Sequence, residues 1–392
     1  MNISKYQNKN NLLALNSMEW SFQPFENLLQ DSTRYLNKIP GKSYLEEANF
    51  PIIDQGKARI AGYSNLENPF AEESIIFGDH TRVLKYIDFP FHIGADGVKV
   101  LLNKRKDIAL TKYIYYYLSS IEIPDTGYNR HFKFLKEIII PLPSLERQKK
   151  IVSVLDKVLQ IITKRQSQIT ALDELAQSVF LEMFGDPVEN PKKYPWANLG
   201  FIGEWKSGGT PKRSVIEYFT GDIPWLSSGE LEQLFTYDSE EHITEEAIKN
   251  SAAKMIEVNS LLLGMYDTAA LKSTILKTPC TCNQAIAFSK IDETKASTLF
   301  VYTYIQIAKE YLKRQQRGVR QKNLNLNMIR ELKIFLPPLQ SQYLFENRRL
   351  EIENQKEKLQ SSLKKLENLH NTLLQKAFKG ELFNEEALEN IK

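Results

Sequence analysis

Residues Leu135–Gln148 read LKEIIIPLPSLERQ, and residues Ile329–Gln342 read IRELKIFLPPLQSQ. The two stretches align without a gap at an offset of 194 residues, as from Pro143 to Pro337, in a chain of 392 residues. The identical pairs include Glu137 with Glu331, Ile140 with Ile334, Leu142 with Leu336, Leu145 with Leu339 and Gln148 with Gln342. The same register pairs Leu172 with Leu366, Leu175 with Leu369 and Phe184 with Phe378. Such a long ungapped match indicates an internal duplication.

Each copy predicts a short apolar strand followed by a long helix. Pro143 and Pro337 end the strands, because proline lacks an N–H group and fixes φ. Apolar residues then recur at alternating three- and four-residue steps, which is the heptad pattern. In the first copy they are Leu155, Val158, Ile162, Ile169, Leu172, Ala176, Val179 and Met183, and in the second copy Ile352, Leu359, Leu363, Leu366 and Leu373. Gly185 with Pro187, and Gly380, are the expected stops.

These helices of roughly 30–40 residues, about 50 Å long, each carry one apolar stripe and therefore need a partner. The nearest partner is the duplicate, so we expect the two helices to form an antiparallel coiled coil. The alternative is that each helix only covers the core of its own globular domain.

The segments between the helices are globular and follow the same order of elements. Strand-rich stretches precede a helix-forming stretch, LTKYIYYYLSSI in the first and LFVYTYIQIAKEYLKRQ in the second, and a loop with glycine and arginine leads into the repeated strand. We therefore predict an α+β fold with an internal pseudo-twofold repeat, in which two globular domains alternate with two long helices. The expected segments are 1–143, 144–187, 188–337, 338–385 and a tail at 386–392.

Composition places no strong demand on partners, since 51 Lys and Arg face 48 Asp and Glu and the net charge is +3. No apolar run approaches the ~20 residues that span a bilayer, and the first residues lack the apolar core of a signal peptide. We expect a cytoplasmic protein without membrane contact. Cys280 and Cys282 are too few for a disulfide framework or a four-cysteine zinc site, so we interpret them as ordinary thiols.

No catalytic motif is complete in this sequence. PGKS at Pro40–Ser43 lacks the earlier glycine of a phosphate loop, because that position holds Leu36. The acid-x-Lys patterns in IDETK and IIDQGK lack a partner acid, and no glycine-rich loop or Asn-Pro-Pro-aromatic tetrapeptide of a methyltransferase occurs. Scattered His80, His92 and His131 do not form a metal motif. We expect a non-catalytic chain with no cofactor and no metal.

Several strings, taken with the duplicated frame, resemble the DNA-specificity subunits of type I restriction-modification systems. SGGTPKRSVIEYFTGDIPWLSSGEL resembles the opening of a target-recognition domain, and FGDHTRVLKYIDFPFHIGADGVKVL resembles a second type of such domain. IPLPSLERQKKIVSVLD and FLPPLQSQ resemble the entry into the spacer helices. The first domain departs from the family pattern, since it has no GGTP opening.

The resemblance implies that each recognition domain reads one half of a bipartite target in double-stranded DNA. The helices would set the spacing, and two DNA-methyltransferase (modification) subunits and motor-nuclease (restriction) subunits would be the protein partners. Two half-sites on one face of DNA need readers held about one helical turn (~34 Å) or a multiple apart, which suits a helical strut. Two alternatives stay open: pairing with a fused methyltransferase-nuclease, and a coiled-coil adaptor that binds no DNA.

Candidate DNA contacts are residues able to bind phosphates or base edges. In the first domain they are Gln55, Lys57, Arg59, Asp79, His80, Thr81, Arg82, Asn129 and Arg130. In the second they are Thr210, Lys212, Arg213, Ser227, Ser228, Glu230, Arg317, Arg320, Gln321 and Asn323. The stretch RQQRGVRQKN is the most basic of these regions and contains no acid. The string GDHT is also typical of a turn, in which Asp79 would bond backbone N–H groups.

Overall fold

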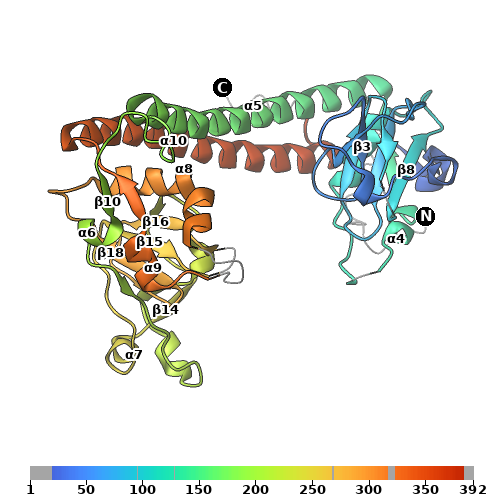
Figure 1. Ribbon diagram of the computed structural model, residues 1–392. Helices are drawn as coiled ribbons and strands as arrows, with labels where there is room; N and C mark the ends of the chain where they lie inside the picture. The colour runs from blue at the N-terminus through green and yellow to red at the C-terminus, as the bar shows by residue number, and fades with distance from the viewer. Residues whose placement is uncertain (1–19, 95, 128, 267–268, 317–322, 384–392) are drawn as a thin grey trace, which may run out of the picture. The chain divides into compact units, whose positions relative to one another are not determined.

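The computed structural model describes residues 20–94, 96–127, 129–266, 269–316 and 323–383 (Figure 1). The chain divides into two compact units, of which unit 1 comprises residues 1–166 with 361–392 and unit 2 comprises residues 167–360. Both divisions fall inside long helices, after Gln166 and Gln360, which are equivalent positions of the 194-residue repeat. The units therefore differ from the segments drawn along the sequence, because each unit includes parts of both helices.

The described globular part of unit 1 contains strands of six residues or fewer and short helices. Its strands are β1 (Ser21–Pro24), β2 (Leu29–Asp31), β3 (Phe50–Ile53), β4 (Gly62–Ser64), β5 (Ser74–Gly78), β6 (Leu84–Ile87), β7 (His92–Ile93), β8 (Val98–Asn103) and β9 (Ile139–Leu142). Its helices are α2 (Phe25–Leu28), α3 (Thr111–Ser119) and α4 (Phe132–Lys136), with 3₁₀ turns at Thr33–Tyr35 and Gly41–Ser43.

The globular part of unit 2 has a corresponding set of elements. Its strands are β10 (Trp196–Asn198), β11 (Lys206–Ser207), β12 (Ile223–Leu226), β13 (Phe235–Thr236), β14 (Glu241–Ile243), β15 (Ser260–Gly264), β16 (Ser273–Leu276), β17 (Thr281–Cys282), β18 (Ile286–Lys290) and β19 (Lys333–Phe335). Its helices are α6 (Leu199–Ile202), α7 (Glu245–Lys249), α8 (Thr298–Gln316) and α9 (Leu326–Glu331), with 3₁₀ turns at Ile216–Phe219 and Ser228–Glu230. In Figure 1, α8 lies against the sheet that contains β15 and β16.

The two globular parts share one topology except at one sheet edge, where unit 2 has the additional strand β13. The larger sheets have the orders β2-β8-β5-β6 and β11-β18-β15-β16-β13, and the smaller sheets have the orders β4-β3-β7 and β14-β12-β17. In each smaller sheet the central strand pairs antiparallel with one neighbour and parallel with the other. In each unit the first strand also pairs antiparallel with the repeated strand, β1 with β9 and β10 with β19. The corresponding order of strands therefore extends through regions whose residues hardly match.

The two long helices are α5 (Leu145–Phe184) and α10 (Leu339–Phe378), each of 40 residues. Their bounds coincide under the repeat offset, and each spans about 60 Å at 1.5 Å per residue. Each ends just before a glycine with positive φ, Gly185 at +84° and Gly380 at +80°, because an αL residue satisfies the last carbonyls of a helix. Every predicted apolar seam residue is buried or half-buried, whereas the equivalent pair Leu175 and Leu369 is 46% exposed.

Within each unit, the start of one long helix packs with the end of the other. In unit 1, Arg147 donates a hydrogen bond to Gly380 O at 3.0 Å, and the core contains residues of both helix parts. In unit 2, Lys356 Nζ lies 2.5 Å from Asp173 Oδ1, and Phe345 packs against Phe180 and Phe184. The two helices thus run in opposite directions in both units.

Aromatic residues at the helix ends complete the cores of the globular parts. The Phe378 ring lies 5.5 Å from Tyr113 and 5.1 Å from Tyr117, both on α3. The equivalent Phe184 lies 5.0 Å from Phe300 on α8. Each such ring buries on the order of 200 Å² of surface, so the helix ends belong to the hydrophobic cores.

Two buried glutamines of the repeat join the long helices to the globular parts. Gln148 accepts a hydrogen bond from Leu110 N at 2.9 Å and donates to Ile108 O and Pro143 O, both at 2.9 Å. Gln342 accepts from Ser297 N at 2.9 Å and donates to Pro337 O at 2.8 Å. Each glutamine side chain therefore accepts a hydrogen bond from the backbone N–H at the start of α3 or α8 (Leu110 and Ser297). The helix itself supplies no acceptor for this N–H.

Among the described helices, none combines the length and apolar character that crossing a bilayer demands. Cys280 and Cys282 are both free and buried, and burial raises the pKa of the Cys280 thiol to about 12. Thiols with raised pKa are poor nucleophiles and poor metal ligands.

Candidate nucleic-acid interface

Three loops of unit 1 meet around Gln55. We name them, with the segment before α4, the loop cluster (described residues 54–56, 79–83, 94, 96–97, 123–127 and 129–131). Gln55 Oε1 accepts a hydrogen bond from His80 N at 3.4 Å, and Gln55 Nε2 donates to Asp96 O at 3.2 Å. Thr81 Oγ1 donates to Gln55 O at 2.5 Å, and His80 Nδ1 lies 3.2 Å from Asn129 O. The structure thus brings Gln55, His80, Thr81 and Asn129 together.

Two glycines allow this close approach of the loops. A Cβ atom at Gly78 would lie 2.1 Å from Thr81 Oγ1, and one at Gly97 would lie 2.6 Å from Gln55 Oε1. Gly97 also has φ of +85°, which favours glycine. The position of Gln55 therefore depends on small residues in the neighbouring loops.

Asp79 supports the loop cluster from inside. It is only 4% exposed, and its Oδ1 accepts a hydrogen bond from Phe132 N at 2.8 Å. Its carbonyl accepts from His131 N at 2.9 Å, and His131 itself is fully buried. This arrangement corresponds to the turn alternative for GDHT, and it leaves Asp79 without a face toward solvent.

The remaining candidates of the loop cluster are Arg82 and Arg130. Arg82 has φ of +62° and forms an ion pair with Asp125 Oδ2 at 2.7 Å. A backbone hydrogen bond from Gly127 and the charge of Arg82 hold the pKa of the Asp125 carboxyl below its usual value. Arg130 is exposed and makes no ion pair with a described residue. Arg130 is therefore the cation that this cluster can offer to a phosphate.

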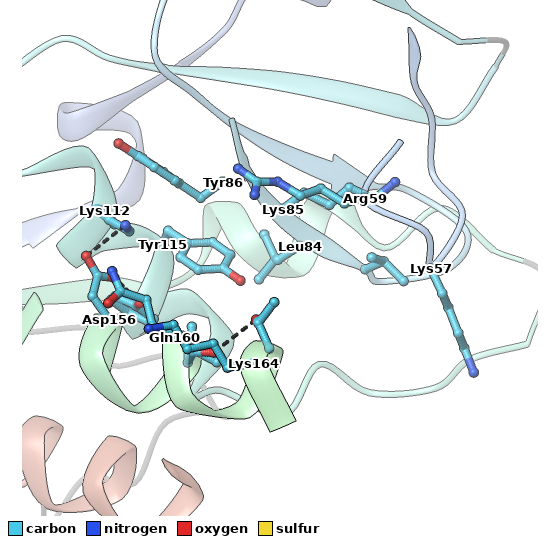
Figure 2. Close-up of a pocket in the computed structure, with 14 residues that line it drawn as sticks. Lys57, Arg59, Leu84, Lys85, Tyr86, Lys112, Tyr115, Asp156, Gln160 and Lys164 are labelled. Carbon is cyan, nitrogen blue, oxygen red and sulfur yellow. Dashed lines mark hydrogen bonds and ion pairs between the residues drawn. The ribbon is translucent and has the colours of Figure 1, made fainter. Parts of the chain in front are cut away.

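Lys57 and Arg59 line a different place, a cavity of about 590 Å³ that runs along β6 (Figure 2). Arg59 lies 3.5 Å from Asp88 Oδ1, and its guanidinium lies 5.2 Å from the ring of Phe89. We name this space the β6 cavity; it is lined by Lys57, Arg59, Val83, Leu84, Lys85, Tyr86, Lys112, Tyr115, Tyr116, Asp156, Leu159, Gln160, Thr163 and Lys164.

In unit 2, the string SGGTP passes close to the backbone of other loops. A Cβ at Gly208 would lie 2.2 Å from Cys282 O, and one at Gly209 would lie 2.3 Å from the carbonyl carbon of Ala252. Thr210 follows, and its hydroxyl donates to Gln284 Oε1. The two glycines of this motif therefore allow the loops to pack closely, and Thr210 is bonded to Gln284 of a neighbouring loop.

Arg213 is engaged inside unit 2, whereas Lys212 is exposed. Arg213 makes two hydrogen bonds to Glu241, at 2.6 and 2.7 Å, and its guanidinium lies over the ring of Trp225 at 4.8 Å. The hydrogen bonds from Arg213 lower the pKa of the Glu241 carboxyl. Lys212 is thus the free cation of the described part of this motif.

Ser227, Ser228 and Glu230 form a structural turn. Glu230 Oε2 accepts from Ser227 N at 2.7 Å, completing a capping box, and Oε1 accepts from Glu240 N at 2.8 Å. Both carboxylate oxygens of Glu230 are therefore occupied by backbone donors. Of the most basic stretch, Arg317, Arg320 and Gln321 lie outside the described residues, and Asn323 is exposed.

Unit 2 has a loop arrangement that matches the loop cluster, and three of its residues escaped the sequence analysis. Met265 N donates to Ala285 O at 2.8 Å, as Asp79 N donates to Gly97 O at 2.7 Å. Leu324 N donates to Met265 O at 2.7 Å, as His131 N does to Asp79 O. The solvent-facing tips here are Tyr266, which is 37% exposed, Asn283 and Gln284. The sequence contains one signal for this match, because SIIFGD (residues 74–79) resembles SLLLGM (residues 260–265), although the offset between them differs from 194.

No metal-binding cluster of His, Cys, Asp or Glu occurs among the described residues. His92 is buried with its Nε2 at 2.9 Å from Leu66 O, whereas His80, near Asn129, and His131, bonded to Asp79, both join the 79–83 loop to the segment before α4. The site consists of polar and cationic loop tips, which can bind phosphates and base edges.

Comparison with known proteins identifies relatives over most of the chain. The family model described as the type I restriction modification DNA specificity domain matches residues 33–171 and 191–376. The specificity subunit of the Escherichia coli type I restriction enzyme EcoR124I/EcoR124II is 31% identical over 275 residues, covering 65% of this chain and 66% of that protein. The MjaIX specificity subunit of Methanocaldococcus jannaschii is 25% identical over 315 residues, covering 72% and 71%. The matches thus span about two thirds of these relatives.

Solved structures share the fold at low sequence identity. The S subunit of a type I restriction-modification system from M. genitalium superposes with a TM-score of 0.60 at 17% identity, covering 92% of this chain and 96% of that one. A chain from a study of complex assembly and conformational transition of the type I system superposes with a TM-score of 0.51 at 16% identity, covering 93% and 98%.

Proposed function

Because the chain belongs to the family of type I restriction-modification specificity subunits, we propose that it is the DNA-reading, non-catalytic subunit of such a complex. Each globular part would read one half of a bipartite target in double-stranded DNA. The observation that carries this proposal is one loop scaffold built twice with different tips, since two unlike half-sites need unlike side chains on a common frame.

The residues proposed to contact DNA are those whose side chains reach solvent at the loop tips. In the loop cluster these are Thr81, Asn129 and Arg130, with Gln55 and His80 behind them; in unit 2 they are Lys212, Tyr266, Asn283, Gln284 and Asn323. Asp79, Arg213 and Glu230 would act by holding the loops, because their charged groups are already bonded to protein. Cations at the tips would bind phosphates, and the amides would read base edges.

The long helices are proposed to form an antiparallel coiled coil that relates the two globular parts by a pseudo-twofold and sets the spacing of the half-sites. Support comes from the equal bounds of α5 and α10 and from their opposed directions in both units. A pair of helices of about 60 Å is of the length that two readers one or two DNA turns apart require.

The proposed partners are two modification subunits and motor-nuclease subunits, in the cytoplasm. The alternative partner is a fused methyltransferase-nuclease. A gel-shift titration of the chain with its modification subunit against a random duplex library tests the proposal. Selection of one split sequence, with affinity that falls steeply as salt rises, is expected. Equal binding of all duplexes would contradict it, and absence of any salt-dependent binding would favour a protein–protein adaptor.

A further inference from the structure

The sheets of the two units differ at one edge. In unit 2, β13 pairs with the outer side of β16, but in unit 1 the sheet ends at β6, which is the counterpart of β16. The equivalence follows from the preceding turns: Gly78 N donates to Val83 O at 2.9 Å, and Gly264 N donates to Lys272 O at 2.8 Å. The turn residues Arg82 and Leu271 also share a positive φ, of 62° and 59°.

This register makes Tyr86 the counterpart of Ile275. Ile275 N donates to Leu234 O at 2.8 Å, and Lys277 N donates to Thr236 O at 2.9 Å. The segment that contains β13 thus accepts hydrogen bonds from the N–H groups on the outer edge of β16. Among the described residues, no strand pairs with the outer edge of β6. The N–H groups of Tyr86 and Asp88 are therefore the unoccupied counterparts of those two donors.

The β6 cavity lies along this unpaired edge. Four consecutive residues, 83–86, line it, and since successive side chains alternate between the faces of a sheet, a space that touches all four follows the strand edge. In unit 2 the corresponding place holds Phe235 of β13, which packs against the core under the side chain of Lys277, at 4.3 Å from its Nζ. Figure 2 shows Leu84 and Tyr115 between the strand and the α5 helix that carries Gln160 and Lys164.

The charges around the β6 cavity are mainly positive. Lys57 and Lys164 are exposed and make no ion pair with a described residue. The one carboxylate among the lining residues, Asp156, is already bonded to Lys112 at 2.8 Å and to the hydroxyl of Tyr116. A peptide bound in the β6 cavity would thus contact aromatic side chains, two free cations and the unpaired backbone groups of β6.

We propose that the β6 edge binds an extended, acidic segment of a partner polypeptide, which adds to the sheet as a parallel strand and places an apolar side chain in the β6 cavity. Strand addition satisfies the backbone groups that an exposed edge leaves open. Carboxylates next to the apolar side chain would pair with Lys57 and Lys164. Unit 2 carries such a segment within its own chain, since Leu234 and Phe235 of β13 are followed by Asp238 and Glu240.

The test uses the whole chain and a fluorescein-labelled peptide with the sequence EQLFTYDSEE of residues 232–241. Anisotropy titration should show saturable binding, and a scrambled peptide of equal composition should bind at least about fivefold more weakly, the effect of roughly one hydrogen bond. Tyr86→Pro removes the outward N–H of an edge strand, which tolerates proline there, together with the ring that lines the β6 cavity; Tyr86→Val removes the same ring. Tyr86→Pro should weaken binding at least about fivefold relative to Tyr86→Val, which keeps the N–H.

The charge contribution is tested by the double variant Lys57→Glu with Lys164→Glu. We expect about tenfold weaker peptide binding, while Lys157→Glu, an exposed control on α5 outside the cavity, should bind as the unaltered chain does. The inference is overturned if the peptide shows no binding up to about 1 mM, if the scrambled peptide binds equally, or if Tyr86→Pro and Tyr86→Val behave alike. Displacement of the peptide by duplex DNA, with an equal loss of DNA affinity in the double variant, would instead make the cavity a phosphate site.

Discussion

Lengthening both long helices by one heptad should change the gap between the DNA half-sites and leave the half-sites themselves unchanged. The insertions belong after Gln166 and after Gln360, the equivalent points at which the chain divides into its compact units. Seven residues add close to two full turns, about 20° short of them, so the apolar seam continues in register. All contacts within each unit are kept, because both helices lengthen together.

The size of the change follows from helix geometry. Seven residues at 1.5 Å each add about 10.5 Å, and base pairs rise about 3.4 Å, so the gap should grow by about three base pairs. Three base pairs also rotate one half-site about the DNA axis by roughly 100°, given about 10.5 base pairs per turn. This rotation must be absorbed by twisting DNA or protein, and we therefore expect weaker binding along with the longer gap.

The assay is methylation-site sequencing of a host that expresses the variant with its methyltransferase. The control inserts four residues at each of the same points, which rotates the seam by about 40° and should abolish methylation by separating the helices. An unchanged gap in the heptad variant would refute the idea that the helices set the spacing. Altered half-sites would refute the assignment of reading to the globular parts.

Three further predictions concern single residues. Gln148→Met should lower the free energy of unfolding by about 3 kcal/mol and Gln342→Met by about 2 kcal/mol, because they lose three and two buried hydrogen bonds at about 1 kcal/mol each. Urea denaturation would measure both losses of stability. A negligible loss in both variants would contradict the role given to the glutamines. Arg213 lowers the pKa of Glu241, so the bonded pair stabilises the folded state fully above the ordinary carboxyl pKa of 4.5, and this stabilisation is lost as pH falls through the lowered pKa. Hydrogen exchange of the loop at residues 210–213 should become faster over that fall in pH. Glu241→Gln should remove this pH dependence. Arg130→Ala should weaken DNA binding alike for all sequences and reduce the slope of log K against log salt by about one; a change in sequence preference instead would assign Arg130 to base reading.

The frame of the molecule was readable from the sequence, since local signals determine it. Heptad spacing predicted the two long helices, and the prolines before them and the glycines after them lie within two residues of the ends of α5 and α10, although the expected segment 338–385 extends past Phe378. The paired Gln148 and Gln342 occupy matching positions. Each of these signals acts through neighbours within one or two helical turns.

The candidate site was only partly readable, because its geometry depends on distant partners. Asp79 looks like a surface residue, but it is bonded to Phe132, and Arg213 is bonded to Glu241 28 residues away. Tyr266 and Gln284 were missed because loops of unequal length shift the alignment of the globular parts away from the 194-residue offset. Residue type indicated which side chains could bind DNA, and only tertiary contacts decided which are free to do so.

The sharing of each long helix between the units has a consequence for biosynthesis. Residues of unit 1 leave the ribosome first, but its core includes Leu374, Ala377 and Phe378, which are made near the end of translation. Unit 2 includes residues 167–360 only, so its core is fully synthesised earlier. The part of the protein that is translated first is therefore the last to acquire all of its core, and until then Phe378 cannot cover the face of α3 around Tyr113 and Tyr117.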